Sequence, residues 1–211
     1  MNKKYELTDE TKEIVGITIH RIRALRDIPR HGVTSGDLGG WIEKENNLSH
    51  KGDAWVCGDA WVCGDAWVCG DACVCDNARV FGDALVSGNV RVSGDARVYG
   101  DAEVYGNAWV FGDARVSGNV RVYGDALVCG DAIVDKEADY MTFKNTWSSG
   151  RYFTYTCSNK MWKVGCFYGN GEELIKKAYA DSEISGKCYE AIVRAVATIE
   201  AAQAEAKGEA K

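Results

Sequence analysis

The feature that most constrains the fold is a hexapeptide that repeats without interruption from Gly52 to Asp135. Fourteen copies follow the pattern G-[DN]-[AV]-x-V-x, and Asp76 replaces the glycine in one of them. The fifth position is always valine, and the third is alanine in all copies but two. A period this regular is typical of a repeat architecture, in which each unit packs only against its neighbours.

Each hexad predicts a short strand, A-x-V-x, followed by a turn, G-[DN]. Strand side chains alternate between faces, so the alanine and valine share one side and the two variable positions share the other. The invariant valine marks the buried side, and glycine followed by Asp or Asn suits a tight turn. One hexad cannot bury its own valine, whereas stacked hexads bury a continuous column. The repeat therefore predicts a β-solenoid.

The pattern V-x-G-[DN]-A-x resembles the hexapeptide-repeat left-handed β-helix family, in which three hexads form one coil of a triangular prism. The resemblance implies a mostly β fold, a single-stranded left-handed parallel β-helix of nearly five coils. At a strand spacing of about 4.8 Å, the prism would be roughly 22 Å long. The handedness is implied by the resemblance alone. Members of this family are commonly trimers, so one face is expected to be an interface of a homo-oligomer.

Three parts are expected along the chain: an N-terminal capping segment over 1–51, the β-helix over 52–135, and a C-terminal α+β cap over 136–211. In the last part, the segments TFKNTW, RYFTYTC and MWKVGCFY predict strands. Helices are predicted in GEELIKKAYA and in KCYEAIVRAVATIEAAQAEA. Such a cap would cover strand edges that otherwise invite aggregation. The apolar face of the second helix would carry Tyr189, Ile192, Val193, Val196 and Ile199.

Tryptophan and cysteine occupy the variable positions of the first three hexads, so both point outward from the prism. Exposed tryptophans on every face of the first coil are unusual for a soluble protein and predict a cover. Residues 14–25 alternate in part like a strand, and this N-terminal segment is expected to wrap the first coil. The tryptophans to be covered are Trp55, Trp61 and Trp67.

The cysteines raise the question of a metal or redox site. Stacking every eighteen residues places Cys57 below Cys75, with Cys73 beside Cys75 on the same outer face. Three thiols this close can bind zinc if one more ligand joins them, and Cys57 and Cys75 are within disulfide reach. Because no CxxC or Cys/His spacing accompanies them, the sequence favours small hydrophobic side chains beneath the cover, with no metal and no cofactor.

The most distinctive outward column is cationic, with arginines at eighteen-residue intervals beside aromatic residues. Like charges on adjacent strands are unfavourable. Either the corner residues Asp95 and Asp113 compensate these charges, or the arginines bind phosphate while bases stack on the aromatic rings. The ligand-binding candidates are Trp61, Arg79, Phe81, Arg97, Tyr99 and Arg115 on this face, and Tyr105, Arg121 and Tyr123 on a second face. The interface candidates on the third face are Trp109, Phe111 and Leu127.

Acyl transfer, the best-known activity that the resemblance implies, uses a histidine near loops that protrude from the prism. All three histidines of this chain precede the first hexad, and His50 is the single candidate close to the prism. Residues 52–135 carry thirteen acidic residues, five arginines and no lysine, which argues against duplex DNA as a partner. No window of about 18 apolar residues predicts a membrane span. Nine cysteines without a signal peptide predict a reduced, cytoplasmic protein.

The flanks YELTDETKEIVGITIHRIRAL and MWKVGCFYGNGEELIKKAY resemble phage- and prophage-encoded hexapeptide-repeat proteins, which are labelled polymer-forming cytoskeletal proteins. The sequence thus predicts a non-catalytic protein in the host-cell cytoplasm. It would sequester or inhibit a host protein or a phosphorylated, nucleotide-like small ligand. The alternatives are a self-assembling component of a filament or particle, and a hexapeptide-repeat acyltransferase.

Overall fold

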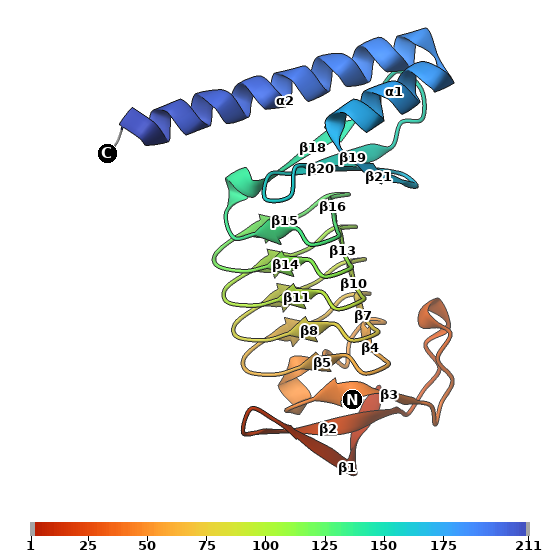
Figure 1. Ribbon diagram of the computed structural model, residues 1–211. Coiled ribbons are helices and arrows are strands. Elements are labelled where there is room, and N and C mark those ends of the chain that lie inside the picture. The colour runs from red at the N-terminus through yellow and green to blue at the C-terminus, as the bar shows by residue number, and fades with distance from the viewer. Residues whose placement is uncertain (1–2, 210–211) are drawn as a thin grey trace.

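The computed structural model describes residues 3–209, which form a prism of stacked coils with a cap at each end (Figure 1). The N-terminal cap contains β1 (Tyr5–Ile14), β2 (Ile17–Ala24) and β3 (Leu38–Ile42). The C-terminal cap contains β18 (Tyr140–Lys144), β19 (Tyr152–Thr156), β20 (Met161–Val164), β21 (Phe167–Gly169), α1 (Gly171–Asp181) and α2 (Glu183–Glu209). The solenoid between them contains β4 (Trp55–Val56), β5 (Trp61–Val62), β6 (Trp67–Val68), β7 (Cys73–Val74), β8 (Arg79–Val80), β9 (Leu85–Val86), β10 (Arg91–Val92), β11 (Arg97–Val98), β12 (Glu103–Val104), β13 (Trp109–Val110), β14 (Arg115–Val116), β15 (Arg121–Val122), β16 (Leu127–Val128) and β17 (Ile133–Val134).

The short strands form three parallel sheets, one along each side of the prism. Strands one coil apart pair in register, so that Arg97 lies beside Arg115 and Val98 beside Val116. With three hexads in each coil, the fourteen hexads make nearly five coils, and the predicted parallel β-solenoid is confirmed. The solenoid strands are ordered β5-β8-β11-β14-β17, β4-β7-β10-β13-β16 and β6-β9-β12-β15.

The interior of the solenoid consists of the third and fifth positions of the hexads, as predicted, and all of these side chains are buried. Glycine at the turn is favoured for two reasons, which Gly70 illustrates. Its φ is 68°, in the left-handed region, and a Cβ there would lie 2.8 Å from the backbone nitrogen of Gly88 in the next coil. Asp76 adopts the same conformation, with a φ of 63°, and its carboxylate accepts a hydrogen bond from the N–H of Gly94 at 3.0 Å.

The backbone bonds between coils give the solenoid two chemically different ends. Apart from the bonds that join two strand residues, N–H groups of one coil donate to carbonyl groups of the next coil. Examples are Arg97 to Ala114 at 2.8 Å and Tyr99 to Val116 at 3.0 Å. At the free edge of the first coil, the backbone groups without a partner in another coil are therefore mainly carbonyl groups. At the free edge of the last coil, they are mainly N–H groups. Because buried backbone groups need partners, the first end needs donors and the last end needs acceptors.

The N-terminal cap continues the solenoid at its end and covers only part of its sides. Strand β3 pairs in parallel with β5, and the N–H groups of Trp41 and Glu43 donate to the carbonyl groups of Ala60 and Val62, each at 3.0 Å. Strands β1 and β2 extend the same sheet beyond β3, below the first coil in Figure 1. The expected cover is present on part of the first coil only: Arg26 and Arg30 reach Gly52 and Asn89 at the side of the prism, while most of the segment pairs with the free carbonyl groups at its end.

The three tryptophans of the first coil consequently differ in burial, although their hexads are identical. The ring of Trp55 lies against Gly39 of β3, where a Cβ would be 2.7 Å from the ring, and the side chain is 1% exposed. Trp61 is half-buried beside β3, and Trp67 is 48% exposed. The cap therefore covers one side of the first coil fully and another in part.

Two buried side chains supply further donors at this end. The ammonium group of Lys4 donates to the carbonyl of Ala54 at 2.5 Å, and Lys4 has no exposed surface. The amide nitrogen of Asn47 donates to the carbonyl groups of Gly64 and Ala66, at 3.0 and 2.9 Å. The end that exposes carbonyl groups is thus closed by N–H and ammonium groups.

The C-terminal cap supplies acceptors to the last coil. The N–H of Leu127 donates to the hydroxyl oxygen of Thr154 at 2.9 Å, and that of Ile133 donates to the hydroxyl oxygen of Ser158 at 2.7 Å. Thr154 belongs to β19 and Ser158 to the turn that follows it, in an antiparallel sheet of order β18-β19-β20-β21 that lies across the last coil (Figure 1). The segment MWKVGCFY forms two strands of this sheet instead of one, because Gly165, with a φ of 56°, turns the chain back.

Helices α1 and α2 cover the outer face of this sheet (Figure 1). On the predicted apolar face of α2, Tyr189 and Val196 are buried in a core with Trp162. Ile199 is 42% exposed, so that part of the prediction is wrong; its neighbour Glu200 turns toward the sheet and leaves Ile199 at the rim. No helix within the described residues is both long enough and apolar enough to cross a bilayer.

Candidate functional site

One outer surface of the solenoid carries a column of arginines, and we call the outward side chains of β5, β8, β11 and β14 and of the residues after these strands the arginine face. Arg79, Arg97 and Arg115 begin three successive strands of this sheet and pair in register. The guanidinium carbon of Arg79 lies 5.8 Å from the ring centroid of Trp61. Since adjacent strands are about 4.8 Å apart, three positive charges follow one another at the spacing of the coils.

An aromatic column runs beside the arginines. The rings of Phe81 and Tyr99 are parallel to within 2°, with centroids 4.9 Å apart. Phe81 also approaches Trp61, with centroids 5.6 Å apart. All three side chains are half-buried, and Phe81 lies between the rings of Trp61 and Tyr99, so Tyr99 ends this aromatic stack. The arginine face thus offers cations and aromatic surface next to one another.

The sequence left open whether corner carboxylates neutralise the arginine column. The corner carboxylates of Asp95 and Asp113 do not neutralise it. In the part of the chain that the structure describes, no carboxylate forms an ion pair with the guanidinium groups of the arginine column. On the neighbouring face, by contrast, Arg121 lies in register with Glu103, and Nε is 3.1 Å from Oε2. This solenoid can therefore neutralise an outward arginine with an acid one coil away, and the arginine face lacks that partner.

The second candidate face combines the Glu103–Arg121 pair with two tyrosines. The rings of Tyr105 and Tyr123 are stacked, with centroids 5.5 Å apart and an angle of 12°. Tyr123 is 50% exposed. Because the charge of Arg121 is already matched, this face attracts anions less than the arginine face does.

The third face is hollowed where the C-terminal cap overhangs it. Trp109 is 49% exposed, whereas Phe111 and Leu127 are half-buried. The ammonium group of Lys163 lies 5.7 Å from the ring centroid of Phe111. An oligomer interface on this face stays a prediction. The hollow has a volume of about 390 Å³ and is lined by Arg91, Ser93, Trp109, Phe111, Leu127, Lys163 and Gly165.

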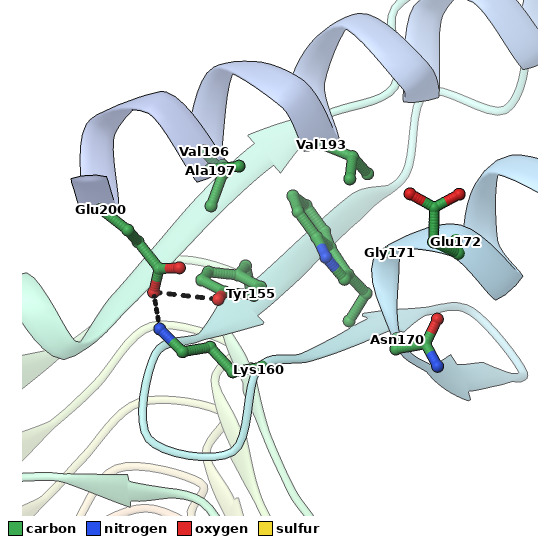
Figure 2. Close-up of a pocket in the computed structure, with 10 residues that line it drawn as sticks. Tyr155, Lys160, Asn170, Gly171, Glu172, Val193, Val196, Ala197 and Glu200 are labelled. Atoms are coloured by element: carbon green, nitrogen blue, oxygen red, sulfur yellow. Dashed lines mark hydrogen bonds and ion pairs between the residues drawn. The ribbon is translucent and has the colours of Figure 1, made fainter.

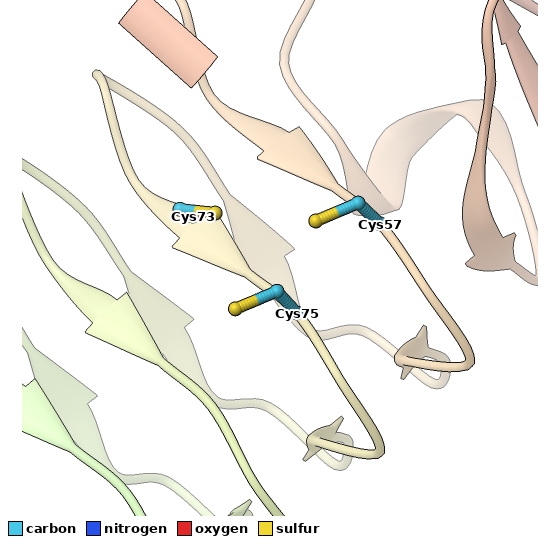
Figure 3. Close-up of side chains that lie close together, drawn as sticks. All are labelled: Cys57, Cys73 and Cys75. Atoms are coloured by element: carbon cyan, nitrogen blue, oxygen red, sulfur yellow. The ribbon is translucent and has the colours of Figure 1, made fainter. Parts of the chain in front are cut away.

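The three cysteines singled out from the sequence meet at the N-terminal part of this third face (Figure 3). The sulfurs of Cys57, Cys73 and Cys75, which we call the thiol cluster, all lie within 4.8 Å of one another. All three thiols are free; Cys73 and Cys75 are buried and Cys57 is half-buried. Nη2 of Arg91 lies 3.5 Å from the sulfur of Cys75. The convergence expected from eighteen-residue stacking is therefore present.

Sequence reasoning assigned no functional residue to the C-terminal cap, where a hollow of about 340 Å³ lies between the sheet and α2 (Figure 2). A carboxylate oxygen of Glu200 accepts hydrogen bonds from the hydroxyl of Tyr155 at 2.9 Å and the ammonium of Lys160 at 2.6 Å. Burial raises the pKa of Tyr155. These polar groups satisfy one another, which fits a structural role. No pattern in the sequence indicates that Glu200 contacts Lys160, which lies forty residues earlier in the chain.

His50, the candidate base for acyl transfer, is packed inside the N-terminal cap. Its ring stacks on that of Tyr5, with centroids 4.3 Å apart, and Nδ1 accepts a hydrogen bond from the N–H of Lys4 at 3.2 Å. Burial lowers the pKa of His50. The imidazole thus supports the cap and does not belong to any of the three outer faces described above.

A family model described as the YdcK β-solenoid repeat matches four stretches of the chain, all within the hexads. The matched stretches include the three arginines of the arginine face and leave out both caps. No curated protein matches the chain. The chain therefore carries β-solenoid repeats, in agreement with its structure. The matched stretches are 72–88, 84–100, 90–106 and 114–130.

Proposed function

We propose that this β-solenoid is a non-catalytic binding protein whose arginine face holds a phosphorylated, nucleotide-like ligand. The observation that carries the proposal is the in-register column of three arginines, which no carboxylate neutralises within the described residues. Like charges on adjacent strands raise the free energy of the unliganded protein. A bound polyanion offsets that cost, whereas a neutral ligand does not.

The chemistry of the arginine face suits successive phosphoryl groups with a base beside them. Each guanidinium presents a planar set of donors that can bind phosphate through two hydrogen bonds. The coil spacing repeats this donor set along the face. The rings of Phe81 and Tyr99 stack on each other in the adjacent column, and Tyr99, at the end of this stack, offers a ring face on which a base can stack.

Two further observations favour binding over the alternative functions. Both ends of the solenoid are closed by caps that give partners to its backbone groups, which opposes end-to-end growth into a filament. The packing of His50 against Tyr5 gives acyl transfer no exposed base on the prism. The resemblance of the flanks to phage- and prophage-encoded proteins leads us to propose that the ligand is a component of a host cell.

Isothermal titration calorimetry with ATP and with pyrophosphate tests the proposal. The double variant Arg97→Ala, Arg115→Ala removes two cations of the arginine face. Arg121→Ala, which removes a cation of the second face, is the matched control. A hydrogen bond to a charged group contributes about 1.5–3 kcal/mol, so the double variant should bind at least ~100-fold more weakly. The control should change affinity less than ~3-fold, because Arg121 is already paired with Glu103.

Circular dichroism of each variant shows whether the coils remain folded. If the folded double variant binds either probe as tightly as the natural sequence, the arginine face is not the binding site. If neither probe binds the natural sequence at millimolar concentration, the phosphorylated-ligand proposal is wrong and a host protein becomes the partner to test.

A further inference from the structure

The thiol cluster follows from the coil geometry together with one departure from the repeat. Cys57 and Cys75 hold the sixth position of hexads one coil apart, and Cys73 precedes Cys75 by two residues on the same outward side. Cys63 and Cys69 belong to hexads identical to that of Cys57, yet neither has a cysteine one coil further along. Within the described residues, three thiols meet at this one place.

The surroundings of the thiol cluster favour a thiolate. The guanidinium of Arg91 lies 3.5 Å from the sulfur of Cys75, and a cation this close to a thiol favours its thiolate form. By contrast, burial raises the pKa of the isolated Cys63 thiol to about 11. Arg91 therefore gives the cluster a cation that can offset the negative charge of metal-bound thiolates.

We propose that Cys57, Cys73 and Cys75 form a three-thiolate site for a soft divalent metal ion, Zn²⁺ or Cd²⁺. A zinc–sulfur distance of about 2.3 Å requires sulfurs about 3.8–4.0 Å apart in a tetrahedral or trigonal site. The sulfurs already lie within 4.8 Å of one another, so small side-chain rotations complete the geometry. On binding, three S–H bonds break, three sulfur–metal bonds form and three protons pass to solvent. The complex carries one negative charge, which Arg91 offsets.

A hollow beside Cys73 provides access to the cluster. It has a volume of about 260 Å³, and Cys73, His31 and Arg91 are among its lining residues. Nε2 of His31 is buried and has no hydrogen-bond partner among the residues described. Three protein ligands with a water in the fourth position is an arrangement that zinc accepts. The hollow therefore leaves room for a water molecule to reach the cluster from the Cys73 side as a fourth ligand.

Titration of the reduced full-length protein with Cd²⁺, in the presence of a competing chelator, tests the site. We expect thiolate-to-cadmium charge-transfer absorption that saturates at one ion per chain. Each of the variants Cys57→Ser, Cys73→Ser and Cys75→Ser removes one of three ligands and should weaken binding at least ~10-fold. Cys63→Ser and Cys69→Ser are matched controls, because they change the same hexapeptide outside the cluster, and they should bind as the natural sequence does. Affinity should rise with pH, because binding releases protons.

Two results would overturn the proposal: no charge-transfer absorption at one equivalent of Cd²⁺, or equal losses of affinity in Cys57→Ser and Cys63→Ser. A second measurement on the unsubstituted protein covers variants that fail to fold. One equivalent of Cd²⁺ should slow alkylation of the three cluster cysteines relative to Cys63 and Cys69, as read by mass spectrometry of peptides. Unchanged alkylation of the cluster would also contradict the site.

Discussion

The two ends of the solenoid are closed in different ways, although the coils between them are nearly identical. At the N-terminal end, β3 adds a strand to the sheet, and Lys4 and Asn47 donate to carbonyl groups. At the C-terminal end, a separate sheet lies across the last coil, and Thr154 and Ser158 accept from N–H groups. The difference follows from the direction of the backbone bonds, because one end leaves mainly acceptors and the other mainly donors without partners.

The comparison indicates what a cap for such a solenoid must provide. A chain that approaches the carbonyl end can continue the ladder with its own N–H groups and can bury donors such as Asn47 completely. Hydroxyl oxygens suit the opposite end, because they accept hydrogen bonds without adding a strand. We therefore expect the N-terminal end to contribute more to stability, and the following substitutions test that difference.

The largest effect is expected for Trp55→Ala, compared with Trp67→Ala in an identical hexad. Trp55 is 1% exposed beneath the N-terminal cap, whereas Trp67 is 48% exposed. Removal of a buried large aromatic side chain costs about 3–5 kcal/mol, and removal of an exposed one costs less than ~1 kcal/mol. Urea denaturation measures both. Equal losses of stability in the two variants would mean that the N-terminal cap does not bury Trp55 more than Trp67.

A smaller effect is expected for the polar groups that close each end. Asn47→Leu leaves the carbonyl groups of Gly64 and Ala66 without their donor, and Thr154→Val leaves the N–H of Leu127 without its acceptor. At about 1–3 kcal/mol for each buried unsatisfied group, the first substitution should cost roughly twice as much as the second. A larger loss for Thr154→Val, measured by the same urea denaturation, would reverse the proposed ranking of the two ends.

A further effect concerns pH and Lys4. Burial lowers the pKa of Lys4 from its ordinary value of 10.5 to about 8. Between these two values the unfolded chain keeps a proton that the folded chain has lost, so the free energy of unfolding should increase as pH rises from 8 to 10.5. Lys4→Met should remove this contribution. If the two proteins show the same pH dependence in that interval, Lys4 is not held in a low-dielectric site.

The solenoid could be predicted from the sequence because its repeat encodes burial, turns and register in every hexad. The thiol cluster and the arginine column could be placed for the same reason, since residues eighteen apart share a column. The identical hexads that begin at Gly52, Gly58 and Gly64 show the limit of this reasoning. The different burial of their tryptophans depends on where β3 docks, and the position of that strand is determined by contacts across the end of the prism.

The missing neutralisation of the arginines could not be predicted from the sequence either. The corner residues Asp95 and Asp113 lie close to the column in the repeat, yet their carboxylates do not reach the guanidinium groups in the structure. Ion pairing depends on side-chain direction, which the hexad pattern does not specify. The in-register pair Glu103–Arg121 shows what a neutralised column looks like in this protein.

That pair suggests the most direct test of the proposed anion-binding face: thermal unfolding of the natural sequence and of Arg97→Glu, each with and without pyrophosphate. Glutamate at this position would lie in register between Arg79 and Arg115. Cross-strand pairs of opposite charge contribute about 0.2–1 kcal/mol each, so the variant alone should unfold at a higher temperature than the natural sequence. Pyrophosphate should raise the unfolding temperature of the natural sequence and leave that of the variant unchanged. A less stable variant, or an equal response of both proteins to pyrophosphate, would contradict a column of unpaired arginines that binds anions.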